Sequence, residues 1–513
     1  MCRHAVDPQR IYSKSPLFLD YLAQRPELLA LFQRAPTAFH EAAVLRSGQD
    51  LPRAALCDAL ADYSRPLDAS ARTLDAIERL REPGSLCVLT GQQAGFLGGP
   101  AYTAYKILTA IRLARHLSGT LDAPIIPTFW LASEDHDFTE INRARWLDTD
   151  GTPRSESFDW EDRGCAIEAL PLTDEIRATL ANVTAALTCP PDLQDLLSPR
   201  EGDDYCRWHA RIWSRLFADD GLVVIEPRAF RHLAGPFFER AFAQADAIRD
   251  GLEAASHRLE SLGFTPALDA RTAGRPFRID AGGKRTRVSA QPYDPSAAYS
   301  ADAALRPVLA DSLFPTVASV LGPGEIAYHA QLRPIYEALG VPQPVVVPRH
   351  GYTVLSGSDA SLLDRLGVSV GAALDPAFDP QPLLDAQIPD ALRQAFTAAR
   401  RGIGDALLPL APLVRQADPG LEARWRQVSD RADREIAQLG ERVARAELAR
   451  AGVSVRRLRA TIESLHPGGQ PQERVLSLVH FLARFGVQWL HQLPEAEHPD
   501  RFSHEVVTIH DQP

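Results

Sequence analysis

The stretch that most constrains the fold runs over residues 86–142, where apolar, glycine-rich and acidic segments follow one another. Residues 86–90 form a short β-rich run, which opens into the glycine-rich segment 91–100. A helix is expected after it, because Pro100 suits a first helical turn and apolar residues then recur at helical spacing. Residues 124–132 are almost wholly apolar, which is typical of a strand covered on both faces.

This order predicts a strand–helix–strand unit whose two strands are parallel. Such a connection is right-handed, and it brings the carboxyl ends of both strands to one edge of the sheet. Open α/β sheets bind ligands at that edge. We therefore expect an α/β protein with a Rossmann-like parallel-sheet core, and a site made by the glycine-rich segment and the acidic segment 133–138.

The glycine-rich segment is a candidate for nucleotide or phosphate binding. Backbone N–H groups of such a loop, together with the positive end of the following helix, attract anions. The segment lacks the Lys-Ser/Thr ending of a P-loop and the Gly-x-Gly-x-x-Gly spacing of dinucleotide-binding folds, so turn formation is an equally good explanation. The residues predicted to bind nucleotide or phosphate are Gly91, Gln92, Gln93, Gly95 and Lys106.

The acidic segment offers an acid, a base, a proton donor or a metal ligand in consecutive positions. Ionisable residues placed directly after a buried strand are costly without a purpose, so we expect His136, Asp135 and Asp137 to be catalytic. The alternative is structural. Asp137 would cap the next helix together with Glu140, which lies three residues later as in a capping box.

Further side chains at predicted strand ends and loops are candidates for substrate binding. Arginine suits a carboxylate or phosphate because its guanidinium can donate two parallel hydrogen bonds, although a surface ion pair explains Arg349 equally well. Glu325 and His329 are one helical turn apart, but ordinary helices often show this spacing, and no metal site is predicted. The predicted substrate-binding residues are Tyr102, Ser133, Glu134, Arg306, Gly322, Gly324, Glu325 and Arg349.

The chain is too long for one core, so we expect several domains, with two insertions into the α/β core. Apolar residues at helical spacing on either side of the segment 417–420 predict an antiparallel coiled-coil arm. Residue types alternate along the chain on either side of Gly282 and Gly283, which predicts a β-hairpin. The expected division is core 1–147 with N-terminal helices, insertion 148–204, core 205–263, insertion 264–307 with the hairpin, core 308–357, coiled-coil arm 358–462, and a helix and strand in 463–513 that return to the core.

Composition limits the function classes. The formal net charge of −11 argues against a nucleic-acid-binding protein, which would need a basic surface. No apolar run reaches the length of a membrane span, and the first residues show no signal peptide. The 6 cysteines contain no Cys-x-x-Cys pair, which fits a reducing cytoplasm and offers no zinc site. We therefore expect a cytoplasmic protein without nucleic-acid or membrane partners.

The segments TGQQAGFLGGPAYTAYK and FWLASEDHDFTEIN resemble the bacillithiol biosynthesis cysteine-adding enzyme family, the cysteine ligases of the last step of that pathway. Residues 305–332, 345–355 and 465–486 agree with this family in order and spacing, so the similarity spans nearly the whole chain. The family has a coiled-coil domain where the arm is predicted. A wide apolar stripe on such an arm favours a homodimer.

The resemblance implies amide formation between the carboxyl group of cysteine and the amine of glucosaminyl-malate, which gives bacillithiol. Because this condensation is uphill in water, we expect ATP to activate the carboxylate, as an adenylate or an acyl-phosphate, with a need for Mg²⁺ left open. On the adenylate route the Gly91 loop would hold phosphates, and His136 would support charge on the α-phosphate. Asp135 or Asp137 would anchor the substrate amine or Mg²⁺, and Arg306 would bind a malyl carboxylate.

Two other functions are compatible with the sequence. A metal-dependent hydrolase could use residues 134–137, although no second histidine lies nearby in the sequence. A nucleotide-binding scaffold could instead recruit a partner enzyme through the coiled coil. The chain also lacks a Lys-Met-Ser-Lys-Ser-like loop and a His-x-Gly-His motif, so analogy with class I aminoacyl-tRNA synthetases rests on the fold alone.

Overall fold

The structure is a computed structural model that describes residues 2–148, 151–162, 164–288, 292–375, 377–386, 388–450 and 454–509. The chain divides into two compact units, which we call the α/β unit and the helical unit. The α/β unit comprises Met1–Asp148, Pro153–Gly357 and Gly469–Pro513, and the helical unit comprises Thr149–Thr152 and Ser358–Gly468.

The α/β unit is built on a parallel sheet, in which the described residues form five strands in the order β11-β10-β2-β3-β6. Every strand predicted for the core is present, which confirms the Rossmann-like α/β core. The chain order reverses between β2 and β10, and ligands bind at such a switch point in open α/β sheets. The strands are β2 Leu86–Gln92, β3 Ile125–Leu131, β6 Val223–Ile225, β10 Thr316–Leu321 and β11 Val345–Pro348.

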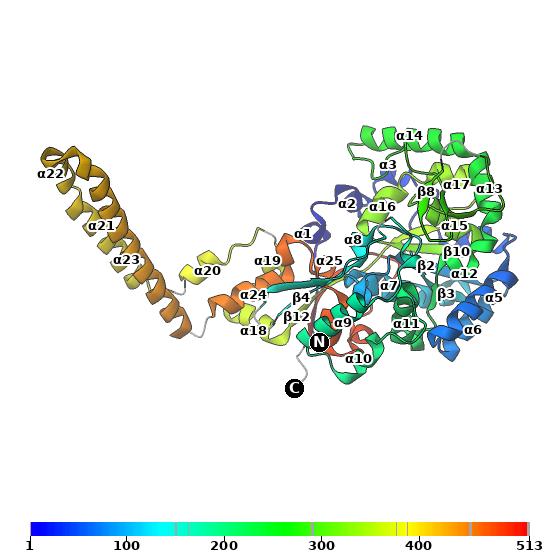
Figure 1. Ribbon diagram of the computed structural model, residues 1–513, viewed down its shortest axis with the longest axis horizontal. Coiled ribbons are helices and arrows are strands. Elements are labelled where there is room, and N and C mark those ends of the chain that lie inside the picture. The colour runs from blue at the N-terminus through cyan, green and yellow to red at the C-terminus, as the bar shows by residue number, and fades with distance from the viewer. Residues whose placement is uncertain are drawn as a thin grey trace. The chain divides into compact units, whose positions relative to one another are not determined.

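Helices cover both faces of this sheet, which explains why its strands are apolar throughout (Figure 1). In β3, Phe129 and Leu131 pack with α7 and α11, whereas Ile126 and Trp130 pack with α5, α6, α15 and α17 on the other face. The helices around the sheet are α4 Phe39–Ser47, α5 Arg53–Ser64, α6 Ala71–Leu80, α7 Tyr102–Leu121, α11 Tyr205–Leu216, α13 Gly235–Ala243, α14 Ala245–Ser261, α15 Leu305–Leu313, α16 Pro323–His329 and α17 Arg333–Leu339.

A second sheet collects strands from both ends of the chain. Its order is β1-β13-β12, with β13 antiparallel to β1 and parallel to β12. The expected C-terminal strand therefore forms, but outside the core sheet. The segment before it folds into short helices that pack against β12 and β4. These elements are β1 Cys2–Ala5, β12 Gly351–Ser356, β13 His504–Ile509, α25 Gln472–Val475 and α26 Leu478–Phe485.

Each expected insertion contributes to a β-hairpin, and the first hairpin begins at Arg143, within the range that was predicted as core. β4 (Arg143–Leu147) pairs with β5 (Pro153–Ser157), and α9 (Asp174–Ala186) follows in the first insertion. β7 (Phe277–Ile279) and β8 (Arg285–Arg287) pair antiparallel, which confirms the predicted hairpin. Gly283 has a φ of +82°, and a Cβ there would lie 2.5 Å from Ala169 Cβ, so the turn requires glycine.

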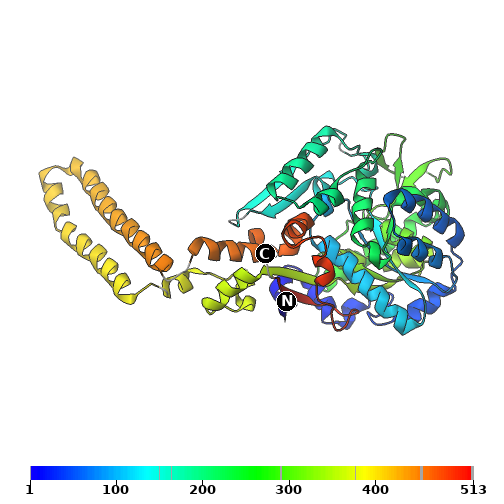
Figure 2. The same cartoon turned by 90° about the horizontal axis from the view of Figure 1, so that it is seen from below.

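The helical unit contains the predicted antiparallel hairpin, whose long helices α21 and α23 lie side by side (Figure 2). Arg400 pairs with Asp433 at 2.7 Å, and Phe396 packs on Gly440, where a Cβ would lie 3.1 Å from Phe396 Cδ1. Neither these helices nor any other in the described chain is long and apolar enough to cross a membrane. The helices of this unit are α18 Gly357–Arg365, α19 Val370–Ala373, α20 Gln381–Ala386, α21 Asp390–Leu407, α22 Leu410–Ala417, α23 Glu422–Arg450 and α24 Val455–Leu465.

Candidate active site

Lys106 connects the two loops at the switch point. Its buried ammonium group donates to Gly91 O at 2.5 Å and to Gln92 Oε1 at 3.1 Å, and lies 2.6 Å from Glu325 Oε2. Glu325 also accepts from Gly322 N at 2.8 Å and so caps α16. Burial lowers the pKa of Lys106, whereas Glu325 favours its charged form. Because an ammonium has three donors, Lys106 positions the loops and has no donor left for phosphate.

The glycine-rich segment packs against the C-terminal part of the α/β unit. A Cβ at Gly95 would lie 2.6 Å from Gly99 Cα, so only glycine fits there. Leu478 N donates to Gly99 O at 2.8 Å, and Ala101 N, at the start of α7, donates to Leu476 O at 2.9 Å. These glycines therefore serve close packing, and the amide at the start of the helix is already bonded within the protein.

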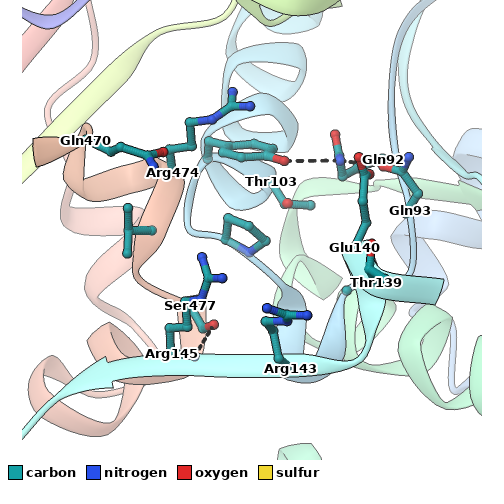
Figure 3. Close-up of a pocket in the computed structure, with 14 residues that line it drawn as sticks. Gln92, Gln93, Thr103, Thr139, Glu140, Arg143, Arg145, Gln470, Arg474 and Ser477 are labelled. Carbon is teal, nitrogen blue, oxygen red and sulfur yellow. Dashed lines mark hydrogen bonds between the residues drawn. The ribbon is translucent and has the colours of Figure 1, made fainter. Parts of the chain in front are cut away.

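A cavity of about 290 Å³ lies beside this segment, and its charged residues were not predicted from the sequence. Arg143 and Arg145 rise into it from β4, and Arg474 enters from α25 (Figure 3). We call it the arginine cavity. Within the residues that the structure describes, no carboxylate forms an ion pair with these arginines. The cavity is also lined by Gln92, Gln93, Gly95, Tyr102, Thr139 and Glu140.

A chain of hydrogen bonds leads from the arginine cavity to the acidic segment. Gln92 Nε2 donates to Tyr102 Oη at 3.2 Å and to Gln93 Oε1 at 2.6 Å (Figure 3). Gln93 Nε2 donates in turn to Asp135 Oδ2 at 3.2 Å. The structure thus brings these predicted residues together, and it places the glutamine amides between the two parts of the site.

Arg349 acts on the site only by positioning its neighbours, because both of its terminal nitrogens are bound inside the protein. They lie 2.6 and 3.0 Å from the carboxylate oxygens of Glu473, and the guanidinium is stacked 5.3 Å from the ring centre of Tyr102. Burial alone would raise the pKa of Glu473, but Arg349, His504 and Tyr12 together outweigh burial and lower this pKa. Arg349 therefore positions Tyr102 and does not reach the cavity.

Asp135 is held as a carboxylate at the centre of the site. Burial favours a raised pKa for Asp135, but Arg306, the N–H of His136 and Arg285 outweigh this and lower its pKa. Arg306 Nη1 lies 3.9 Å and Arg285 Nη1 lies 3.8 Å from the carboxylate oxygens. Asp135 thus faces both the glutamine amides and two guanidinium groups.

His136 is fixed by Arg285, a residue that the sequence analysis missed. Arg285 Nη1 lies 2.9 Å from His136 Nδ1, and the guanidinium is stacked 4.1 Å from the ring centre of Phe277. Arginine can only donate, so this geometry requires a neutral His136 ring with its hydrogen on Nε2. The side chain is 48% exposed, which leaves that N–H available to a ligand.

A second cavity, of about 170 Å³, lies where the acidic segment faces the β7–β8 hairpin, and we call it the acidic-loop cavity. Its polar lining sets Arg285, Arg287 and Arg306 against the carboxyl groups of Glu134, Asp135 and Asp302. Within the described chain, no three His, Cys, Asp or Glu side chains come together in a way that could hold a metal ion. The lining residues include Glu134, Asp135, His136, Phe277, Arg285, Arg287, Asp302 and Arg306.

Other predicted residues have structural partners. Asp137 accepts from Thr139 N at 3.2 Å and Thr139 Oγ1 at 2.7 Å, so it caps α8 (Phe138–Ile141), as the structural alternative predicted. Glu134 accepts from Arg231 at 2.8 and 3.0 Å, and burial raises its pKa to about 7 despite this partner. The predicted residues that do not line the described cavities are Lys106, Ser133, Asp137, Gly322, Gly324 and Arg349.

Comparisons with known proteins agree with this architecture. Residues 5–295 and 284–350 match the family model described as "Bacillithiol biosynthesis BshC, N-terminal Rossmann-like domain", and residues 352–509 match the corresponding "C-terminal coiled-coil domain". Similar proteins carry the name "Putative cysteine ligase BshC". The one from Heliobacterium modesticaldum is 32% identical over 542 residues, covering 93% of this chain and 95% of that protein.

The similarity holds across distant bacteria. The protein of this name from Geobacillus thermodenitrificans is 30% identical over 495 residues, covering 89% of this chain and 90% of its own length. The one from Salinibacter ruber is 28% identical over 542 residues, covering 99% of this chain and 98% of its own length. With both domain models matched in order, the chain belongs to the bacillithiol biosynthesis BshC family.

Proposed function

We propose that this protein is an ATP-dependent ligase that joins the carboxyl group of cysteine to the amine of glucosaminyl-malate, forming bacillithiol. The names of its relatives support a cysteine ligase of this pathway. The observation that carries the proposal is the arginine cavity. The malyl group offers two carboxylates. In the described chain the guanidinium groups of Arg143, Arg145 and Arg474 form no ion pair with a carboxylate, so they suit a dianion at the ligand-binding edge of the sheet.

The substrate amine then belongs near Asp135. A malyl group among the arginines would direct the sugar past Gln92 and Gln93 toward this carboxylate, which is kept ionised by its neighbours. Asp135 would hold the amine or a Mg²⁺ ion that accompanies ATP. Arg306 lines the acidic-loop cavity and not the arginine cavity, so we assign the malyl carboxylates to Arg143, Arg145 and Arg474 instead of Arg306.

The acidic-loop cavity fits the phosphates of ATP better than the glycine-rich segment does. Arg285, Arg287 and Arg306 line it, and the Nε2–H of His136 can donate to a phosphate oxygen. When bound, ATP would supply the adenylyl or phosphoryl group that makes the cysteine carboxylate reactive toward an amine. The protein's own residues hold their charged and polar groups in place before the reaction. Such preorganised electrostatics accounts for most of the rate enhancement at sites of this kind.

We also propose that the protein is a homodimer joined through the helical unit. Leu408 is 66% exposed, Leu413 60% and Val428 49%, and all lie on the hairpin of α21, α22 and α23 or in its connections. Contiguous exposed apolar side chains mark interaction surfaces, and an identical hairpin offers a matching stripe. A cytoplasmic location is proposed as well, since the described cysteines are free thiols.

Substitution in the arginine cavity tests the substrate assignment. Arg145→Ala and Arg474→Ala each remove a charged donor from a dicarboxylate, so KM for glucosaminyl-malate should rise about tenfold or more. The KM for cysteine should stay within about twofold, because cysteine lies elsewhere in the site. Steady-state kinetics with each substrate varied in turn gives both values.

Arg154→Ala is the matched control, because Arg154 lies on β5 of the same hairpin and outside the described cavities. It should leave both KM values unchanged. Equal rises in both values for Arg145→Ala and Arg474→Ala, or no change in either, would contradict the assignment of the dicarboxylate to this cavity.

A further inference from the structure

A third, smaller cavity of about 40 Å³ lies at the switch point itself. Gly91 of β2, Trp130 of β3 and Ser319 of β10 form its sheet side, and His329 of α16 closes it from above the sheet edge. It shares Trp130 and Arg306 with the acidic-loop cavity, so the two cavities adjoin. We call it the His329 chamber.

The chamber is bordered by buried polar groups that lack partners. His329 is 1% exposed, and neither of its ring nitrogens has a hydrogen-bond partner in the described chain. The same holds for Trp130 Nε1 and Asp311 Oδ1 within those residues. A buried polar group without a partner is costly, and such groups are rare in native proteins. Several of them around one cavity point to a ligand that supplies the missing partners.

The protonation state of His329 determines which ligand groups can form hydrogen bonds with it. Burial lowers the pKa of His329 to about 3, and the nearby charges of Arg306 and Lys106 add to this. The ring is therefore neutral, with one N–H and one lone pair. Such a ring can accept from one group and donate to another, so it suits a ligand group that both donates and accepts. A thiol, which is a weak donor and a weak acceptor, matches this.

The size of the chamber also limits the ligand. A cavity of about 40 Å³ holds roughly three water molecules at about 10–15 Å³ each, which is room for a small side chain such as a methylene and a sulfur atom. Leu89, Ala310 and Leu321 make its apolar walls, which suit a polarisable sulfur atom. Arg306, at the junction with the acidic-loop cavity, lies where the carboxylate of the same amino acid would emerge.

We propose that the His329 chamber binds the side chain of the cysteine substrate, with His329 and Trp130 around the thiol and Arg306 at the carboxylate. This inference rests on the proposed function and adds the place where the amino acid is recognised. It puts the carboxylate beside His136 and the phosphate-binding arginines, while the thiol stays protonated and away from them. Since the thiolate is the reactive form of cysteine, this arrangement also protects the activated carboxyl group from the wrong nucleophile.

The test is a binding measurement on the full chain with ³⁵S-cysteine under reducing conditions, with and without a non-hydrolysable ATP analogue. Serine and alanine serve as competitors. His329→Leu removes the polar ring, and Ala310→Val fills the opposite wall. Each should weaken cysteine binding by about tenfold or more, whereas malate binding should stay the same. Serine and alanine should compete at least about tenfold less well than cysteine.

His480→Leu is the matched control. His480 is also buried in the α/β unit, and it does not line the described cavities. It should bind cysteine like the wild type. If His329→Leu fails to fold, Ala310→Val decides alone, with circular dichroism confirming its fold.

The outcomes separate the inference from the proposed function. Wild-type cysteine binding and product formation, with unchanged binding in folded His329→Leu or Ala310→Val, would overturn the chamber assignment and leave the ligase intact. Equal competition by serine would overturn the thiol preference. A wild-type protein that neither binds cysteine nor forms product would overturn the proposed function, and the inference with it.

Discussion

Asp135 and Glu134, two neighbouring carboxyl groups of the acidic segment, have pKa values that are shifted in opposite directions. Arg306 and Arg285 help to keep Asp135 ionised, and it lines the acidic-loop cavity. Glu134, the preceding residue, is buried against Arg231, and burial raises its pKa to about 7. Adjacent carboxyl groups with opposite pKa shifts mark a site where protonation is controlled.

Glu134 should make the fold less stable as the pH rises. A carboxyl group with a raised pKa in the folded state favours folding when protonated, and this contribution is lost between its ordinary pKa and about 7. Glu134→Gln carries no such charge. The unfolding free energy of the wild type should therefore fall relative to the variant by about 1–3 kcal/mol between about pH 5 and about pH 8.

Denaturant unfolding of both proteins across this pH range gives the comparison. A difference that stays constant with pH, or that grows in favour of the wild type, would show that Arg231 keeps Glu134 ionised throughout.

Individual site residues were predictable only where the local sequence determines their surroundings. Gln92, Asp135 and His136 follow strands whose apolar runs are evident, so their place at the sheet edge follows from the topology. Arg285 contacts His136 across 149 positions, and Arg474 enters from a helix that packs on the core only in the folded chain. Nothing in the spacing of the sequence indicates such contacts.

The same reason explains the predicted residues that took other roles. Lys106 and Arg349 were expected to bind ligands, because in the sequence Lys106 lies close to a predicted loop and Arg349 follows a predicted strand. In the fold their charges meet Glu325 and Glu473 in buried pairs. A buried cation needs such a partner, but the sequence does not show which acid will be close.

The loops after β2 and β10 behave as one element because Lys106 and Glu325 join them. Lys106→Met should reduce the unfolding free energy by about 3–5 kcal/mol, since it leaves Glu325 and Gly91 O without their partner. The double variant Lys106→Met/Glu325→Gln should lose less than the sum of the two single variants. Chemical denaturation of the four proteins gives the coupling energy, and strictly additive losses would contradict the bridge.

Strands and helices were predictable where burial leaves a clear periodic pattern. The five core strands are apolar on both faces, so each appears as a continuous run within the described chain. β1 and β12 were missed because they lie in a small second sheet, where polar residues such as Glu505 of β13 interrupt the apolar pattern. The arm was predicted because long amphipathic helices carry the strongest signal.

The proposed dimer can be tested on the hairpin of the helical unit. Leu413→Glu and Val428→Glu place charges in the exposed apolar stripe, which would oppose pairing of two copies. Each variant should run as a monomer in sedimentation or light-scattering experiments where the wild type runs as a dimer. Arg431→Glu, on an exposed position of α23, is the control and should stay dimeric. A monomeric wild type would contradict the proposal.

Within the α/β unit, the cavities form one connected site. The arginine cavity, the acidic-loop cavity and the His329 chamber meet around Gln92, Asp135 and Arg306, at the point where the strand order reverses. In the proposed function, each cavity binds a different group, which is a dicarboxylate, the phosphates of ATP or a small thiol side chain. An amide-forming ligase needs these groups side by side, because proximity supplies much of its rate.

The measurement that tests this most directly is an assay of the purified full chain with ATP, cysteine and glucosaminyl-malate, in which mass spectrometry follows the thiol product and AMP and ADP are quantified together. We predict bacillithiol with one equivalent of AMP, for an adenylate, or of ADP, for an acyl-phosphate. His136→Ala should lower the rate by about 100-fold or more and still bind cysteine, and His116→Ala, on the exposed face of α7, should match the wild type. Wild-type protein that binds ATP but forms no product would contradict a self-sufficient ligase and favour a scaffold that needs a partner enzyme.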